Sequence, residues 1–147
     1  MTSDVRVRRA TTDTEIERCH PVMVQLRPHV QRSEFSEVVR RLAARGGYAL
    51  VYVEDGGRVA AVAGYRVLEM LSRGRFLYVD DLVTAADARS RGHGALLLDW
   101  LVAEARRLCC TRVDLDSGTG RERAHAFYRR RGMDVTALHF AVDVPPG

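Results

Sequence analysis

The order of apolar segments predicts a mixed α/β fold, with six strands and four helices along the chain. Three observations lead to this expectation. Alternating apolar residues mark strands, apolar residues at helical spacing mark helices, and the connections change from a short hairpin early in the chain to a helical crossover later. With 147 residues and no linker, repeat or low-complexity segment, we expect one domain spanning residues 1–147.

The first half of the chain predicts a strand, two helices and a hairpin. Val and Arg alternate at the start, and Thr12 with Glu15 has the spacing of a capping box. Pro21 predicts a bend or break within the helix that follows. Asp-Gly between two apolar runs is typical of a hairpin turn. The predicted elements are a strand at 5–9, helices at 12–26 and 33–45, and strands at 48–54 and 59–68.

The second half predicts alternating strands and helices. Thr119 and Glu122 repeat the capping-box spacing, and Gly132 is placed to end the helix that they open. Alternating apolar residues close the chain from Val135 to Val144. The predicted elements are a strand at 75–84, a long helix ending near residue 108, a strand at 112–116, a helix reaching residue 131, and a strand at 135–144.

Composition argues against several classes of protein. The net charge of +4 is mild and the arginines are scattered, so we expect no nucleic-acid partner. No apolar run approaches the ~20 residues of a membrane span, and the amino terminus lacks a secretory apolar segment, so we expect a cytoplasmic protein without a membrane partner. The cysteines, Cys19, Cys109 and Cys110, lack metal-ligand spacing, so we expect no metal.

An arginine-rich loop with two glycines precedes the longest amphipathic helix. It reads Arg89-Ser90-Arg91-Gly92-His93-Gly94-Ala95. No capping residue stands immediately before the helix, and basic side chains crowd an end where the helix dipole is already positive. An anion on the free N–H groups would reverse that repulsion, and glycines would let it approach the backbone. The loop predicts a pyrophosphate site; the alternative is a tight turn with surface arginines.

Two adjacent acids, Asp80 and Asp81, lie inside an apolar strand. The two-residue period of a strand would direct one carboxylate to each face. One of them would then lie on a covered face, unless the backbone slips at a bulge or opens to a cleft. The alternative is a pair at a strand end that faces solvent.

This element order, with R-x-x-G-x-G at the start of the long helix, resembles the GNAT superfamily of N-acetyltransferases. The segments DDLVT, RSRGHGALLL, LDSG and AHAFYRRRGM are similar to a small bacterial branch often labelled histone-acetyltransferase-like. The resemblance implies an α+β fold, in which a twisted, mostly antiparallel sheet of about six to seven strands carries about four helices on both faces. It also implies acetyl-CoA as co-substrate, a primary amine as acceptor, and a possible homodimer.

The resemblance also implies roles for individual residues. The strand before the loop would splay at a bulge, pair with pantetheine and polarise the thioester carbonyl, and Val83 N–H is the expected oxyanion donor. Tyr128 would protonate the departing thiolate, although a core aromatic is the alternative. The expected acetyl-CoA contacts are Leu82, Val83, Thr84, Arg89, Arg91, Gly92, His93, Gly94, Ala95 and Ser117.

The general base and the acceptor stay open at this stage. Asp81 or Asp80 is the expected base, directly or through a water, with His125 and His139 as rivals because of the intrinsic pKa of imidazole. Arg27 and His139 are the expected acceptor contacts, and nothing separates a small amine, an amino acid, an antibiotic or a protein lysine. A non-catalytic acyl-CoA sensor and a basic nucleic-acid-binding domain are the alternative functions.

Overall fold

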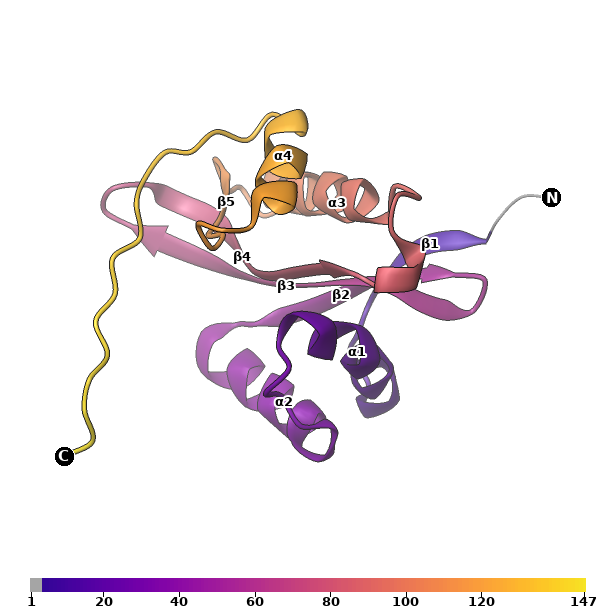
Figure 1. Cartoon of the computed structure of the whole chain (residues 1–147). Helices are drawn as coiled ribbons and strands as arrows, with labels where there is room; N and C mark the ends of the chain where they lie inside the picture. The colour runs from indigo at the N-terminus through magenta and orange to yellow at the C-terminus, as the bar shows by residue number, and fades with distance from the viewer. Residues whose placement is uncertain (1–3) are drawn as a thin grey trace. The chain divides into compact units, whose positions relative to one another are not determined.

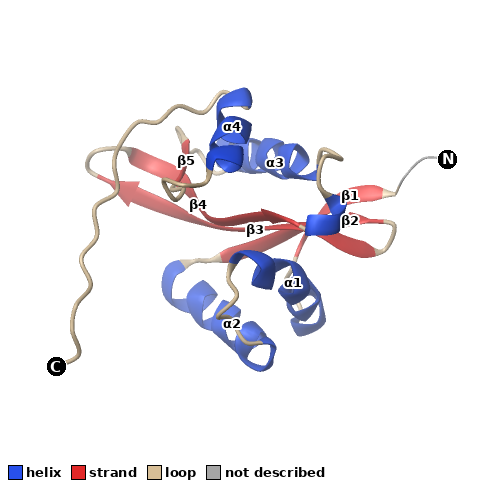
Figure 2. Cartoon of the chain, viewed as in Figure 1, coloured by secondary structure: helices blue, strands red, loops and turns tan. Residues whose placement is uncertain are grey.

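The computed structural model describes residues 4–147, as two compact units that meet in the sequence between Leu115 and Asp116. The first unit contains a five-stranded sheet and the second a single helix (Figures 1 and 2). In chain order the strands and α-helices are β1 Val5–Arg9, α1 Asp13–Leu26, α2 Phe35–Gly46, β2 Ala49–Asp55, β3 Arg58–Met70, β4 Gly74–Thr84, α3 His93–Arg107, β5 Val113–Leu115 and α4 Glu122–Arg130. Short 3-10 helices lie at Arg32–Glu34 and Ala86–Ala88.

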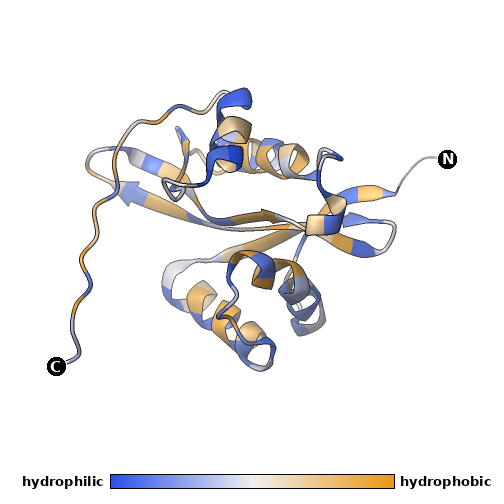
Figure 3. Ribbon diagram, in the orientation of Figure 1, coloured by the Kyte–Doolittle hydropathy of each residue, from blue (hydrophilic) through white to orange (hydrophobic). Residues whose placement is uncertain are grey.

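The sheet has the spatial order β1-β2-β3-β4-β5. Neighbouring strands from β1 to β4 are antiparallel, and β5 pairs with β4 in parallel. Helices α1 and α2 cover one face and α3 covers the other (Figure 1). Because side chains alternate along a strand, Tyr52 and Val62 pack toward α1 and α2, whereas Val53 and Leu77 pack toward α3. In Figure 3, orange segments along the strands accordingly mark their apolar residues.

Helix α1 begins as its sequence predicts. Glu15 N–H donates to Thr12 Oγ1 at 3.2 Å, and Thr12 N–H donates to Glu15 Oε1 at 3.0 Å, which closes the capping box. The backbone N–H groups of Thr12 and Thr11, which both donate to the Glu15 carboxylate, lower the pKa of Glu15 to about 2. Of the bend or break predicted at Pro21, the break is wrong, since α1 continues through this residue. The missing proline N–H removes one intrahelical bond, and buried residues on both sides, Cys19 and Val22 among them, hold the helix against the sheet.

The second unit departs from the prediction at both ends of its helix. The capping box at Thr119 does not form, because Arg121 takes the N-cap position and no side chain caps it. Gly132 ends the helix in a left-handed conformation, with φ of +85°, as expected. The predicted strand at 135–144 is wrong, since the described chain from Asp134 onward contains no regular element. A strand needs a neighbouring strand for its backbone hydrogen bonds, and the described residues of the second unit contain no other strand.

The sheet therefore has five strands where about six to seven were expected, although the predicted fold class is confirmed. Within the described residues, no helix combines the length and the apolar character that crossing a membrane requires. The expectation of one domain for the whole chain stays a prediction.

Candidate active site

The loop before α3 leaves the start of that helix without a cap. Gly92 is the N-cap residue in a left-handed conformation, with φ of +83°, and no side chain of the described residues caps the helix. Ser90 is also left-handed, with φ of +66°, an uncommon conformation for a residue with a side chain. The first turn contains no acidic residue, and Arg89 and Arg91 are exposed. The dipole and the first N–H groups of α3 are thus available to an anion.

His93 holds this loop through its side chain. The ring is buried, with Nε2 2.9 Å from Asp55 Oδ2 and Nδ1 3.3 Å from the Ala88 carbonyl oxygen. Asp55 ends β2, so the contact fixes the start of α3 to the turn between β2 and β3. Any contact of His93 with a bound phosphate is therefore left to its backbone, because its ring is occupied.

The outer edge of β4 is open near the loop. β5 pairs only with Leu77–Val79, so no strand of the described chain lies beside Leu82–Thr84 on that edge. Ala85 N–H donates to the Ala60 carbonyl at 2.8 Å, and N–H groups alternate in direction along an antiparallel strand. Leu82 and Thr84 therefore present their N–H and C=O groups to the open edge, whereas Val83 turns toward β3. The expectation of Val83 N–H as oxyanion donor is wrong for this reason.

A β-bulge produces this arrangement. Gly64 pairs with Asp81 whereas the next residue, Tyr65, pairs with Val79, so Asp80 is the extra residue of β4. Upstream of the bulge, Leu77 N–H points outward and donates to the Arg112 carbonyl at 3.0 Å. The extra residue reverses this parity, which is why Leu82 points outward although its distance from Leu77 is odd.

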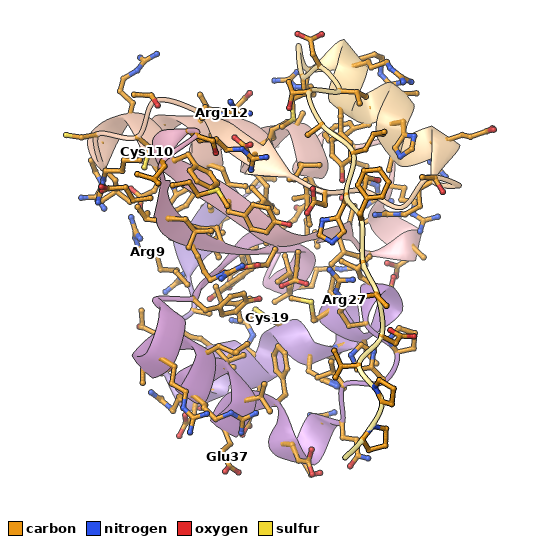
Figure 4. All side chains as sticks on the ribbon, turned by 90° about the vertical axis from the view of Figure 1, so that its left-hand side faces the viewer. Arg9, Cys19, Arg27, Glu37, Cys110 and Arg112 are labelled. Carbon is orange, nitrogen blue, oxygen red and sulfur yellow. The ribbon has the colours of Figure 1, made fainter. Side chains whose placement is uncertain are left out.

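The bulge also places both acids of β4 beside arginines. Asp80 accepts hydrogen bonds from Arg66 Nη2 at 2.7 Å and Arg66 Nε at 2.8 Å. Asp81 Oδ1 accepts one from Arg27 Nε at 2.8 Å, and the Asp80 carbonyl accepts one from Arg27 Nη2 at 2.9 Å. Arg66 leaves β3 on the face that α1 and α2 cover, because its neighbour Tyr65 packs on the α3 side. Arg27, which Figure 4 labels, follows α1. The expected slip at a bulge is confirmed, and the two carboxylates gather on one side.

Tyr48 completes this acidic cluster, which consists of Asp80, Asp81, Arg27, Arg66 and Tyr48. The buried Tyr48 hydroxyl donates to Asp81 Oδ2 at 2.8 Å, so each carboxylate oxygen of Asp81 already accepts one hydrogen bond. Burial, reinforced by Asp81, raises the pKa of Tyr48 well above its usual value. The phenol therefore stays protonated and keeps its role as a donor.

Gly64 makes room for the Tyr48 ring. A Cβ at this position would lie 1.8 Å from Tyr48 Oη and 2.3 Å from Cζ, distances at which atoms overlap. Sequence reasoning missed Tyr48, Gly64 and Arg66. A glycine inside an apolar strand was the available signal, because it often marks a bulge or a close approach. The contact between Tyr48, which precedes β2, and Gly64 of β3 has no local pattern in the sequence.

The remaining predicted residues belong to the second unit. Ser117 lies before α4, and His125 and Tyr128 lie on it. Burial raises the pKa of Tyr128, and the Arg121 guanidinium opposes this shift. His139 Nδ1 lies 3.3 Å from Asp116 Oδ2 in the same unit. These roles stay predictions.

An open hollow of about 420 Å³ lies between α1 and the β2–β3 turn, but two of its arginines, Arg18 and Arg58, already pair with Glu54 and Asp87. It contains neither the loop before α3 nor the acidic cluster. Among residues 4–147 no group of three or more His, Cys, Asp or Glu side chains is placed to hold a metal ion.

Comparison with known proteins gives consistent results. The Acetyltransferase (GNAT) family model matches residues 12–133. An uncharacterized N-acetyltransferase, YhdJ of Bacillus subtilis, is 28% identical over 137 residues, which is 92% of this chain and 96% of that protein. A transcriptional regulator from Bacillus halodurans has a similar structure, with a TM-score of 0.83, 16% identity, and coverage of 95% of this chain and 99% of the other. An aminoglycoside N-acetyltransferase in complex with CoA also has a TM-score of 0.83, with 14% identity and coverage of 98% and 97%.

Proposed function

We propose, since this chain belongs to the GNAT acetyltransferase family, that it moves an acetyl group from acetyl-CoA to a primary amine by direct transfer between two bound substrates. One observation carries the proposal. A helix start without a cap follows closely behind an open strand edge, on the same stretch of chain between Leu82 and Gly94. The first feature suits a pyrophosphate, and the second suits an extended amide chain such as pantetheine.

The cofactor side of the proposed site is mostly backbone. The N–H groups of the loop up to Ala95 hold the pyrophosphate, and Arg89 and Arg91 add positive charge. Pantetheine lies along the outer edge of β4, where the N–H and C=O groups of Leu82 and Thr84 point. Leu82 N–H is the oxyanion donor in this proposal. A fixed backbone donor stabilises charge that develops on the thioester oxygen without having to reorient.

The acceptor side of the proposed site is the acidic cluster. A primary amine is an ammonium ion at neutral pH and must lose a proton before it attacks the thioester. Asp81 or Asp80 receives that proton, directly or through a water. Arg27 acts in this proposal by holding Asp81, and the contact with the acceptor that was expected of Arg27 would have to displace that ion pair.

Tyr128 is the proposed acid. Its raised pKa keeps the phenol protonated at neutral pH, and the positive charge of Arg121 favours release of the proton to a thiolate. Ser117 remains a proposed CoA contact, and His139 a proposed acceptor contact.

Two measurements test the proposal in sequence. Thermal denaturation with and without saturating CoA tests binding, and release of free thiol from acetyl-CoA across a panel of amines tests transfer. We expect a higher melting temperature with CoA and thiol release that depends on the amine. Stabilisation by CoA without thiol release from any amine would favour an acyl-CoA sensor. No stabilisation by CoA at all would refute both functions.

A further inference from the structure

The ring of His93 joins the two ends of the loop before α3. His93 is the first residue of the helix, and its Nδ1 lies 3.3 Å from the carbonyl oxygen of Ala88, which ends the 3-10 helix on the other side of the loop. The ring is buried, since only 4% of the residue is exposed. Residues 89–92 therefore form a short closed loop whose ends are connected by one side chain.

This loop has a backbone shape that needs support from its surroundings. Ser90 has φ of +66° and Gly92 has φ of +83°, so two of its four residues are left-handed. A residue with a side chain keeps such a conformation only when other contacts hold it there. The N–H groups of the loop can converge on a phosphate only while this shape persists. The contacts that hold the loop therefore decide how often it is ready to bind.

The turn between β2 and β3 supplies two contacts to this segment (Figure 1). Asp55 Oδ2 lies 2.9 Å from His93 Nε2, and Arg58 Nη2 donates to Asp87 Oδ1 at 2.6 Å. Both side chains of the second pair are exposed, and ion pairs of this kind contribute little. In the first pair the ring is buried and the carboxylate can only accept, so Nε2 carries a proton and Asp55 fixes the orientation of the ring. The contact with Asp55 is therefore the one that holds the loop.

We propose, on the premise of the proposed function, that Asp55 is a positioning residue of the pyrophosphate site, which acts through His93 to keep the loop in its binding shape. Asp55 contributes no group to the coenzyme in this role. Without its carboxylate the buried ring loses an acceptor, and the loop divides its time between the shape in this structure and others. Affinity for CoA decreases in proportion to the time that the loop spends in the binding shape.

Titration calorimetry of CoA binding to the full chain tests this role. We expect Asp55→Ala to raise the dissociation constant for CoA at least about tenfold. Asp55→Asn keeps an oxygen that can accept from Nε2, and we expect it to raise the constant less than about threefold. The matched control is Glu54→Ala, because Glu54 is the neighbouring residue but pairs with Arg18 of α1 on the opposite face of the sheet. This control should bind CoA as the wild-type protein does. Equal losses in Asp55→Ala and either of the other variants would refute the proposal.

Two further measurements separate positioning from a general loss of stability. In a His93→Phe background Asp55→Ala should not weaken CoA binding further, and an equal loss in both backgrounds would contradict action through the ring. The second measurement needs no coenzyme. Leu96 N–H donates to the Gly92 carbonyl at 3.0 Å, so its hydrogen–deuterium exchange reports the start of α3. Asp55→Ala should speed this exchange at least about tenfold and leave unchanged that of the Leu108 amide at the other end of the helix. Unchanged exchange at Leu96 would refute the proposal.

Kinetics of acetyl transfer give a readout that lost stability alone does not move. With an accepted amine, Asp55→Ala should raise KM for acetyl-CoA and leave kcat unchanged, because a loop held by bound coenzyme has regained its shape. A lower kcat with an unchanged KM would contradict a role confined to coenzyme binding. Equal CoA binding by the wild-type protein and Asp55→Ala would refute this role and leave the proposed function intact. A wild-type protein that does not bind CoA would overturn both.

Discussion

The contact between Gly64 and Tyr48 gives the sharpest test of the site geometry. In Gly64→Ala the new Cβ would overlap the Tyr48 ring, with Oη at 1.8 Å and Cε2 at 2.5 Å. The buried ring must move, and overpacking of this kind costs about 1–3 kcal/mol. The movement also breaks the hydrogen bond to Asp81, and a buried polar group without a partner costs about 1–3 kcal/mol more. We therefore expect a loss of at least about 2 kcal/mol in the free energy of unfolding.

For a chain of this length such a loss lowers the melting temperature by at least about 4 °C. Urea denaturation gives the free energy, and Gly46→Ala is the matched control. The nearest atom to a Cβ at Gly46 is Arg66 Cδ at 3.9 Å, an ordinary contact, so we expect little change. In a Tyr48→Ala background the overlap is gone, and Gly64→Ala should then be nearly neutral. If Gly64→Ala is as stable as the wild-type protein, or costs the same without the Tyr48 ring, the reasoning is refuted.

Three further predictions concern the loop, the proposed acid and low pH. Gly92→Ala, at φ of +83°, should weaken CoA binding about tenfold by straining the loop. Gly74→Ala, strained similarly at φ of +67° but outside the site, should leave the affinity for CoA unchanged. Equal affinities for CoA in both variants would contradict the pyrophosphate site in the loop before α3. Tyr128→Phe should lower kcat at least about 100-fold while acetyl-CoA affinity changes little, and an unchanged kcat would remove the acid role. The Arg107 hydrogen bond lowers the pKa of Glu104 to about 2 from an ordinary value of 4.5. The contribution of the ionised Glu104 carboxylate to stability is therefore fully present above pH 4.5 and is lost as pH falls toward 2. Urea denaturation at pH 7 and pH 3 should show that the free energy of unfolding decreases less between these pH values for Glu104→Gln than for wild type. Equal decreases would contradict the stabilising role of the Glu104 carboxylate.

Local patterns in the sequence predicted much of the fold and the main candidate loop. The capping box at Thr12 formed because its donors and acceptors lie within one turn of the chain. The loop before α3 has the predicted lack of a cap, since that property depends only on neighbouring residues. The adjacent acids Asp80 and Asp81 pointed to a bulge, because no regular strand places both on one face.

Contacts between distant segments could not be predicted in the same way. Arg27 and Asp81 are 54 residues apart in the sequence, so no local pattern indicates that they pair. The sequence alone therefore suggests Arg27 as a substrate contact, whereas in the fold it binds Asp81. The sequence does not reveal where the bulge lies, because the bulge is a property of the pairing between β4 and β3. The position of the bulge decides the direction of every later N–H group in β4, so the sequence alone could not exclude Val83 as the oxyanion donor.

The sequence by itself determined the succession of helices and strands up to α4, the turn glycines and the uncapped start of α3, all of which depend on residues within a few positions of one another. The tertiary structure alone decided which acids meet which arginines, and which backbone groups of β4 face outward. It also decided that Val135–Val144, despite its alternating pattern, is not a strand in this structure. The physical reason is that period and capping are local, whereas a strand exists only where another strand accepts its hydrogen bonds.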